Sequence, residues 1–486
     1  MVTPQARIRI PVLFLAGFLY FVFRIYLHDW YIDTDAWGFI HYGQVLLQEG
    51  IFVADSNKLL VDLVGLIPAY LDCPILFPLI TAVFGSAACL ALYELILYLT
   101  GHRGYALAGW GIILLSPVLY WLVLACNSVV YATCFLMGSL YFFTREDSHK
   151  GSTFLVLAAL SRPEPFVLIV FAAGHFFWQW KQKVLPAVQF SGLLIKLALP
   201  PMVWLAANFY KTGNVFYSFQ LAQTYTKSTG QNYQGADFPR HLFELLSTYY
   251  FNYMALAFCT VGLLFCLKKI RRLRFIYGFL VLSTLGYWVL APFDIPLLER
   301  YLLPIFFYLV IFGALIFNEV GSRWNPSFPP LNKKNSLAAI LPVLFLTLFI
   351  HLPAHSVIER IIAFHKGFDH DIPKIADHLR WQLSEGGAKK LNVLASERRA
   401  AHLKYLLYEY HPRLSISSPR GIYFNKTSFL EEKVEWIVYA PNDLYPIDSA
   451  FYILDLLSEE GLKKQGMHVE KTIKISENTQ MLHLVR

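Results

Sequence analysis

Long runs of apolar residues recur along the chain from its N-terminus to about residue 351 and then stop. A helix needs roughly 20 apolar residues to cross the ~30 Å hydrocarbon layer of a bilayer, and most of the runs approach that length. The pattern therefore predicts a polytopic α-helical membrane module over residues 1–351, with about ten or eleven spans, and a water-soluble domain over residues 352–486. The spans are expected at residues 8–27, 74–98, 104–124, 127–143, 152–161, 166–180, 190–208, 249–267, 275–291, 301–318 and 337–351.

After residue 351 the pattern changes to short apolar segments that alternate with amphipathic ones. Strands and helices that alternate in this way are typical of a small α/β domain. The tail has no glycine-rich phosphate loop, no Cys/His cluster with metal-ligand spacing and no nucleophile elbow, so a lid or scaffold is favoured over an independent catalytic domain. Helices are expected at residues 373–385, 397–408 and 449–460, and strands at 390–395, 434–440, 468–475 and 481–485.

The composition agrees with a bilayer environment. Hydrophobic residues make up 56% of the chain and charged residues only 15%, which is too few to solvate a globular surface of 486 residues. The net charge of +8 does not indicate nucleic acid, because the basic residues fall largely in short loops between the predicted spans. All six cysteines lie in or beside those spans, so no disulfide framework is implied.

The basic residues also set the predicted orientation. Arg7 and Arg9 precede a first apolar run that is too long for a signal-peptide core and lacks a small-residue cleavage site, so this run is expected to stay as a span. With the N-terminus in the cytoplasm, the basic cluster 268–274 lies inside, as the positive-inside rule demands. The predicted location is the cytoplasmic (inner) membrane, with the polar chemistry on its outer face. The segments placed outside are 28–73, 209–248, 292–300 and the C-terminal tail.

The first outer loop carries Asp33 and Asp35 among aromatic residues, directly after the first span. Two carboxylates at a membrane interface can serve as a general base or as a metal-ligand pair. They can equally cap the amphipathic helix that the pattern predicts over residues 36–48, because Asp is a favoured N-cap residue. The residues alone leave both interpretations open.

A second candidate is the segment 161–165, Ser-Arg-Pro-Glu-Pro, which interrupts the apolar pattern after a span that is too short to cross. A charged, proline-rich break at membrane depth is tolerated only where it is buried in protein or lines a wet cavity. Arg162 and Glu164 are therefore candidates for contact with a substrate, or for pairing with each other.

Taken in order, these features resemble the GT-C superfamily of membrane glycosyltransferases, especially the members that use polyprenyl-phosphate-linked sugars. In that family an acidic residue opens the first outer loop, and an amphipathic helix then runs to a glycine, as Asp35 through Gly50 do here. The segment 161–164 resembles the family's Arg-Pro-Glu turn, and the segment 299–304, Glu-Arg-Tyr-Leu-Leu-Pro, resembles its Arg-Tyr-leading late span. With the outer soluble tail, the resemblance covers essentially the whole chain.

The resemblance implies a GT-C-type fold and transfer of a sugar from a polyprenyl-phosphate donor to a glycan, lipid or protein acceptor at the outer face of the membrane. Asp35 matches the family's general base best, and Asp33 is a neighbour whose charge raises the pKa of the pair. Many relatives have adjacent Asp and Glu instead, so the assignment between the two stays open. The metal-dependent oligosaccharyltransferase branch has a Trp-Trp-Asp signature that this tail lacks, so no metal and no cofactor are expected.

The lipid phosphate of such a donor requires cations on the outer side. Arg300 is the first candidate because of its planar fork of donors, although an arginine at the end of a span can simply reach toward the interface. Tyr301 follows it in the same motif, and Lys58 lies where related enzymes place a basic residue. The amides and aromatic rings of residues 211–249 suit sugar recognition, and they suit any other polar loop equally well.

Two other functions compete with this interpretation. A transporter or flippase would use broken helices and charge at mid-membrane, but no inverted repeat is detected and the acidic pair lies in an outer loop. A non-catalytic scaffold for assembly of the cell envelope is the other alternative. An enzyme consumes a lipid-linked sugar in detergent, whereas a transporter requires two sealed compartments.

Overall fold

The apolar runs of the N-terminal module form helices in a computed structural model of the chain, and their ends coincide with residues that favour caps and turns. One helix ends at Gly101, which adopts a φ of 72° and donates its N–H to the carbonyl of Leu97. Another begins after Asn127, whose side chain accepts a hydrogen bond from the N–H of Val129. The helices are α1 (Pro4–Leu27), α2 (Thr34–Glu49), α3 (Leu59–Tyr70), α4 (Leu76–Thr100), α5 (Arg103–Leu114), α6 (Pro117–Leu124), α7 (Ser128–Thr144), α8 (Ser148–Ser161), α9 (Phe166–Lys181), α10 (Ala187–Thr212), α12 (Phe238–Leu245), α13 (Tyr253–Phe265), α14 (Arg274–Leu290) and α15 (Leu303–Trp324), with short turns η1 (Leu246–Tyr250), η2 (Cys266–Lys269) and η4 (Glu299–Leu302).

The structure describes most of both predicted domains. The predicted span 337–351, Asp33, residues 218–219 and 221–237 of the polar loop and most of the predicted helix 449–460 lie outside the described residues. The described residues are 4–28, 34–50, 58–217, 220, 238–250, 253–269, 273–290, 299–324, 354–362, 371–386, 388–411, 413–418, 433–439, 459–464, 466–476 and 479–485.

Several helices have the length and apolar character of membrane spans. Within the described part of the chain, three qualify, Ile10–Leu27, Leu76–Thr100 and Ala187–Tyr210, and the α5–α6 pair makes a fourth if it counts as one span. Apolar side chains on two of them are widely exposed, with Val12 on the first at 58% and Ile195 on the last at 74%. An exposed apolar surface of this extent indicates a membrane protein. The predicted total of about ten or eleven spans stays a prediction.

The predicted span 104–124 is bent in the structure. Helices α5 and α6 meet at an angle of 53°. Ser116 lies at the bend and is extended, with φ −63° and ψ 123°. It precedes Pro117, and a residue before proline is pushed out of the helical region by the proline ring. The bend therefore follows from a single proline that the hydrophobic pattern did not register.

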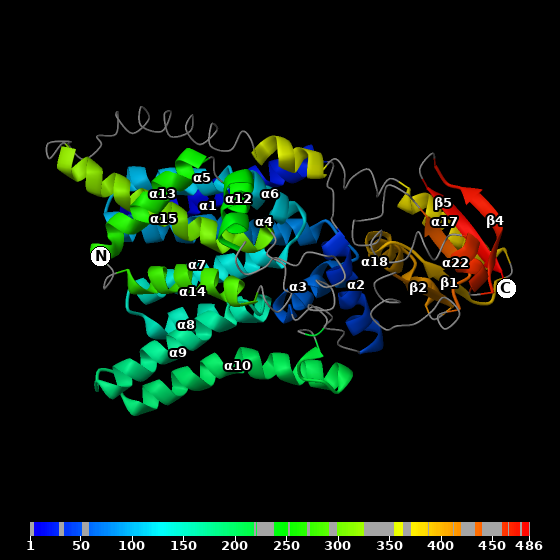
Figure 1. The fold of residues 1–486 in the computed structure, drawn as a ribbon, viewed down its shortest axis with the longest axis horizontal. Helices are drawn as coiled ribbons and strands as arrows, with labels where there is room; N and C mark the ends of the chain where they lie inside the picture. Colours follow the sequence, from blue (N-terminus) through cyan, green and yellow to red (C-terminus); the bar gives the residue numbers. More distant parts are fainter. Residues whose placement is uncertain are drawn as a thin grey trace.

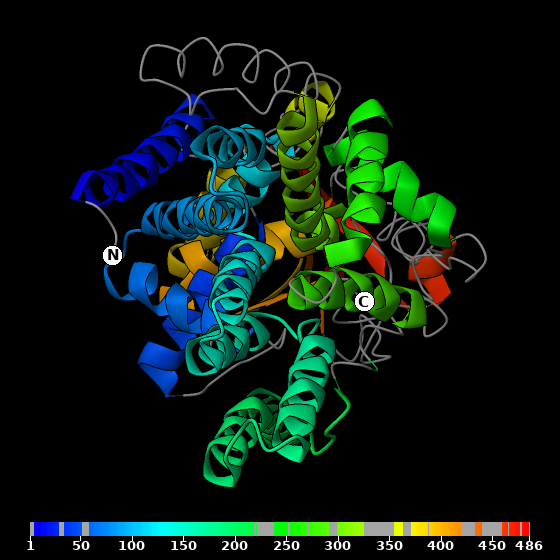
Figure 2. The same ribbon diagram turned by 90° about the vertical axis from the view of Figure 1, so that its left-hand side faces the viewer.

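The core of the helical module lies among α4, α7 and α15. The side chains of Met137, Phe306 and Phe312 are completely buried there. The hairpin of α9 and α10 lies at the edge of the bundle in both views (Figures 1 and 2). The N-terminal end of the chain and the C-terminal sheet lie at opposite ends of the molecule (Figure 1).

Helices α2 and α3 lie between the bundle and the C-terminal domain (Figure 1). They pack so closely that two glycines are required. A Cβ atom added at Gly65 would lie 2.3 Å from the carbonyl oxygen of Phe39, and one added at Gly43 would lie 2.7 Å from the carbonyl oxygen of Gly65. The backbones of the two helices are therefore in direct contact.

The C-terminal domain contains the expected small sheet with helices beside it. Its strand order is β2-β1-β3-β5-β4, in which β1 pairs in parallel with β2 and β3, while β5 pairs antiparallel with β3 and β4. Ile375 and Leu403, from two helices, pack with Val393 and Trp436 of the sheet. Strand β2 was not among the predicted strands. The elements are α17 (Ile372–Ser384), β1 (Leu391–Leu394), α18 (Glu397–Leu406), η5 (Tyr408–Tyr410), β2 (Leu414–Ser417), β3 (Trp436–Tyr439), α22 (Glu459–Lys464), β4 (His468–Lys474) and β5 (Gln480–Val485).

Candidate functional site

The charged break that the sequence predicts between two spans forms a buried ion pair. Helix α8 ends at Ser161 because Arg162, which precedes a proline, is extended with φ −158° and ψ 150°. The Nε of Arg162 donates to the two carboxylate oxygens of Glu164 at 3.0 and 2.9 Å, and its Nη2 donates to one of them as well. The side chains are only 8% and 23% exposed. A bidentate pair of this kind satisfies two charges that are costly to bury alone.

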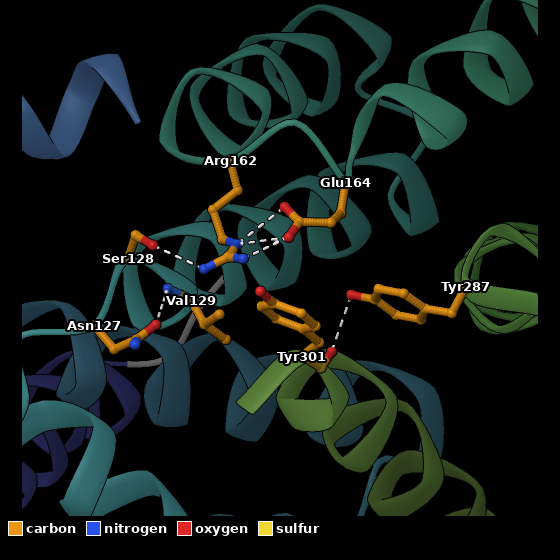
Figure 3. A network of polar contacts seen from close by, with 7 residues as sticks. All are labelled: Asn127, Ser128, Val129, Arg162, Glu164, Tyr287 and Tyr301. Carbon is orange, nitrogen blue, oxygen red and sulfur yellow. Dashed lines mark hydrogen bonds and ion pairs between the residues drawn. The ribbon is translucent and has the colours of Figure 1, made fainter. Parts of the chain in front are cut away.

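Arg162 also joins this pair to three other elements. Its Nη1 donates to the Oγ of Ser128, the first residue of α7, at 2.8 Å. Its guanidinium carbon lies 4.8 Å from the centre of the Tyr301 ring, a cation–π distance. Tyr287, from α14, stacks on that ring at 7° and donates its hydroxyl to the carbonyl oxygen of Tyr301 at 3.1 Å. Figure 3 shows this network, in which Arg162 is the central side chain.

The two other predicted phosphate-binding cations lie at the edge of the same cluster. The guanidinium of Arg300 is 5.6 Å from the centre of the Tyr301 ring. The ammonium of Lys58 interacts electrostatically with Glu164 and lies 5.2 Å from the ring of Phe39, on α2. The structure thus brings together the five residues that the sequence analysis proposed for binding: Arg162, Glu164, Arg300, Tyr301 and Lys58.

The predicted general base Asp35 lies in the first turn of α2, the helix that also carries Phe39. Asp35 is the second residue of α2 and therefore not its cap, because the helix begins at Thr34. Positions 35 and 39 are four residues apart and share one face of the helix. Phe39 is the residue that Lys58 overlies. Position 35 is therefore on the side of α2 that faces Lys58.

A further candidate, Asp62, lies one turn after Lys58 on α3 and was not among the predicted site residues. Its side chain is 4% exposed, and neither carboxylate oxygen has a hydrogen-bond partner among the described residues. Burial raises the pKa of Asp62 to about 7, although the charge of Lys58 lowers it in part. The signal was present in the sequence, because Asp62 is the only charged residue of the apolar helix Leu59–Tyr70.

A second polar cluster joins the end of α1 to the helical residues 354–362. Glu359 accepts hydrogen bonds from Arg24 at 2.5 Å and from the hydroxyl of Tyr120 at 2.7 Å. The guanidinium of Arg24 also stacks over the Tyr120 ring at 3.9 Å, and His28 and His355 lie within 4.0 Å of the Glu359 carboxylate. These contacts fasten the segment that follows the membrane module back onto its first helix, which is a structural role.

No group of three or more His, Cys, Asp or Glu side chains that could hold a metal ion occurs among the described residues. The predicted absence of a metal or cofactor requirement stays a prediction. No protein-family model matches the chain, and no curated protein matches it either.

Proposed function

We propose that the protein is a membrane glycosyltransferase that moves a sugar from a polyprenyl-phosphate donor to an acceptor on the outer face of the membrane. The observation that supports this most is the convergence of residues chosen from sequence alone. Arg162, Lys58 and Tyr301 come from segments more than 100 residues apart, yet they lie in one cluster beside the start of α2. Cations gathered in this way are suited to bind an anionic group.

In the proposed reaction Asp35 takes the proton from the acceptor hydroxyl. The acceptor oxygen forms a bond to the anomeric carbon while the bond from that carbon to the phosphate oxygen breaks, so the anomeric configuration inverts. The electron pair of the broken bond stays with the lipid phosphate, whose charge becomes more negative. Arg300 and Lys58 offset that charge. The phosphate is already a good leaving group, so positioning and charge stabilisation supply most of the catalysis.

Arg162 and Glu164 serve this site as a scaffold in the proposal. Three of the donor interactions of Arg162 are directed to Glu164 and one to Ser128. The pair holds the Tyr301 ring under the guanidinium, and Tyr301 in turn contacts Arg300. Tyr301 is therefore held beside Arg300, and in the proposal Arg300 binds the donor phosphate.

The test uses the full chain purified in detergent with a chelator present. The donor source is a polyprenyl-lipid extract from the membranes of a strain that lacks this protein, and the measurement is release of free polyprenyl phosphate on addition of envelope glycans, lipids or proteins from that strain. Release by the wild type but not by Asp35→Asn supports the proposal. Absence of release in detergent, together with movement of the lipid-linked sugar across reconstituted vesicles, would identify a transporter instead.

A further inference from the structure

The C-terminal domain contacts α2 through an aromatic stack near the start of that helix. The imidazole of His402, on α18, lies parallel to the indole of Trp37, with ring centres 4.0 Å apart and an angle of 13°. The ring of Tyr405 lies 4.8 Å from the same indole. Trp37 is 8% exposed as a result. It lies two residues after Asp35, so the domain holds the first turn of α2.

Polar contacts extend this interface along the rest of α2 and to the end of α3. The hydroxyl of Tyr408 donates to Glu49 at 2.8 Å, and His411 lies 3.7 Å from the same carboxylate. The hydroxyl of Tyr405 donates to Asp72 at 3.0 Å. Figure 1 shows α18 beside α2, at the junction of the sheet domain and the bundle.

We propose that His402 is a positioning residue for the transfer reaction: by stacking on Trp37 it fixes the first turn of α2, in which Asp35 lies. This inference rests on the function proposed above. Under this proposal the C-terminal domain holds Asp35 in position through the stack of His402 on Trp37, a contact called the clamp below. The clamp is sensitive to acid.

The acid sensitivity follows from the burial of two histidines. Burial lowers the pKa of His402 to about 4, and its Nδ1 has no partner among the described residues. Burial and the nearby charge of Lys404 lower the pKa of His41 to about 4, although Glu49 acts in the opposite direction. Among the described side chains, other titratable or charged groups on the elements packed around the two rings include Asp62 on α3, Asp72 after α3, Arg399 on α18, Glu409 and His411 at η5, and Lys374, Asp377, His378 and Arg380 on α17.

The direction of the pH effect on docking depends on whether the docked or the undocked state binds protons more strongly. A histidine freed by undocking returns to a pKa of roughly 6.5, whereas the docked ring keeps a pKa near 4. The docked state is therefore fully favoured above pH 6.5, and it loses stability as the pH falls from 6.5 toward 4. At pH 5.0 the docking equilibrium weakens roughly 30-fold for each ring that becomes exposed.

Docking can be measured without any substrate. Hydrogen–deuterium exchange of the α2 peptide over residues 36–49, corrected for intrinsic rates, reports how often the helix is released in the purified full chain. The wild type should be protected at pH 7.5 and should open at least about 30-fold more often at pH 5.0. His402→Phe keeps an aromatic ring but has no group that titrates, so α2 should stay protected at pH 7.5. The increase in opening between pH 7.5 and pH 5.0 should be roughly 30-fold smaller in this variant than in the wild type.

Two further variants complete the test. His402→Ala removes the ring and should leave α2 poorly protected at both pH values. His468→Phe makes the same change as the first variant at an exposed histidine of the same domain, on β4, and should behave as the wild type. A wild type without pH dependence, an unaltered pH effect in His402→Phe, or full protection in His402→Ala would each overturn the clamp.

Kinetics separate this proposal from the function on which it rests. If Asp35 is positioned by the clamp, His402→Ala should lower kcat with little change in the KM for the lipid donor, and His402→Phe should restore kcat. Loss of α2 protection with an unchanged kcat would refute the positioning role while leaving the glycosyltransferase intact. The expected exchange results from a wild type that transfers no sugar would keep the clamp and reject the proposed function.

Discussion

The substitution Glu164→Gln tests the strength of the buried ion pair. It keeps the shape of the side chain and removes its charge, which leaves the guanidinium of Arg162 buried at 8% exposure without its counter-ion. Removal of one partner from a buried pair costs about 3–5 kcal/mol, because the remaining charge is uncompensated. We therefore expect Glu164→Gln to lower the stability of the membrane module by that amount.

The assay is equilibrium unfolding in mixed detergent micelles, with increasing dodecyl sulfate as the denaturant. A matched control is available in the exposed pair of Arg240 and Glu244, which lie 2.8 Å apart with side chains 82% and 51% exposed. Glu244→Gln should cost no more than about 0.5 kcal/mol, because exposed pairs in water contribute little. Equal midpoints for Glu164→Gln and the wild type would refute the calculation.

The double substitution Arg162→Met with Glu164→Leu then distinguishes scaffold from substrate contact. Replacement of a whole buried pair by apolar residues of similar size is often neutral or stabilising by about 1–4 kcal/mol. The double variant should therefore be more stable than Glu164→Gln alone. If the pair only supports Tyr301, this variant should keep substantial transfer activity; if Arg162 binds the phosphate, activity should disappear from a stable protein.

The remaining predictions concern the base, the phosphate site, the buried acid and the topology. Asp35→Asn should lower turnover by about 10²- to 10⁴-fold with near-normal expression and donor binding, as measured in detergent with chelator, because the amide keeps the shape and loses the basicity. Arg300→Ala should weaken use of the lipid donor strongly, and Arg300→Lys only partly, because lysine keeps the positive charge but lacks the two parallel N–H groups of the guanidinium. Equal, near-normal KM values for both variants would assign Arg300 to the membrane interface. Asp62 destabilises the fold as the pH rises from about 4 to about 7, because its carboxyl loses the proton at a lower pH in the unfolded chain than in the folded one. In unfolding at pH 7.5, Asp62→Asn should therefore be more stable than the wild type by up to about 4 kcal/mol. At pH 4 the two should be nearly equal in stability. A cysteine at Ser417 should react with an impermeant label from outside intact cells and one at Lys269 should not; the reverse pattern would invert the proposed active face.

The sequence predicts those features of the fold that depend on the local hydrophobic pattern and on helix-breaking residues. The apolar runs predicted the positions of α4 and α10. Pro163 predicted the end of α8, because a proline restricts the residue before it wherever it occurs. Alternating short elements gave the C-terminal sheet. Strand β2, Leu414–Ser417, escaped prediction because its four residues form a strand only by pairing with β1.

Features that depend on contacts between distant segments could not be predicted in the same way. The partner of Arg24 is Glu359, 335 residues away, and nothing near either residue indicates the other. The burial of Asp62 follows from the packing of α3 against its neighbours, and the docking of α18 on Trp37 depends on where the sheet domain lies. The motifs indicate the candidate residues, and the fold shows which of them lie close together.

The charges that do meet are suited to a group whose negative charge grows during the reaction. Lys58, Arg162 and Arg300 bring three positive charges to the cluster, while Glu164 brings one negative charge and Asp62 only a partial one, because its pKa is raised to about 7. A lipid-phosphate sugar carries one negative charge, and the lipid phosphate that leaves carries up to two. In the proposed reaction these cations stabilise the departing phosphate, with its second negative charge, more than the bound donor, which is the condition for electrostatic catalysis. Ionisation of Asp62 above pH 7 adds a negative charge close to Lys58, so it should oppose the proposed transfer as well as the fold.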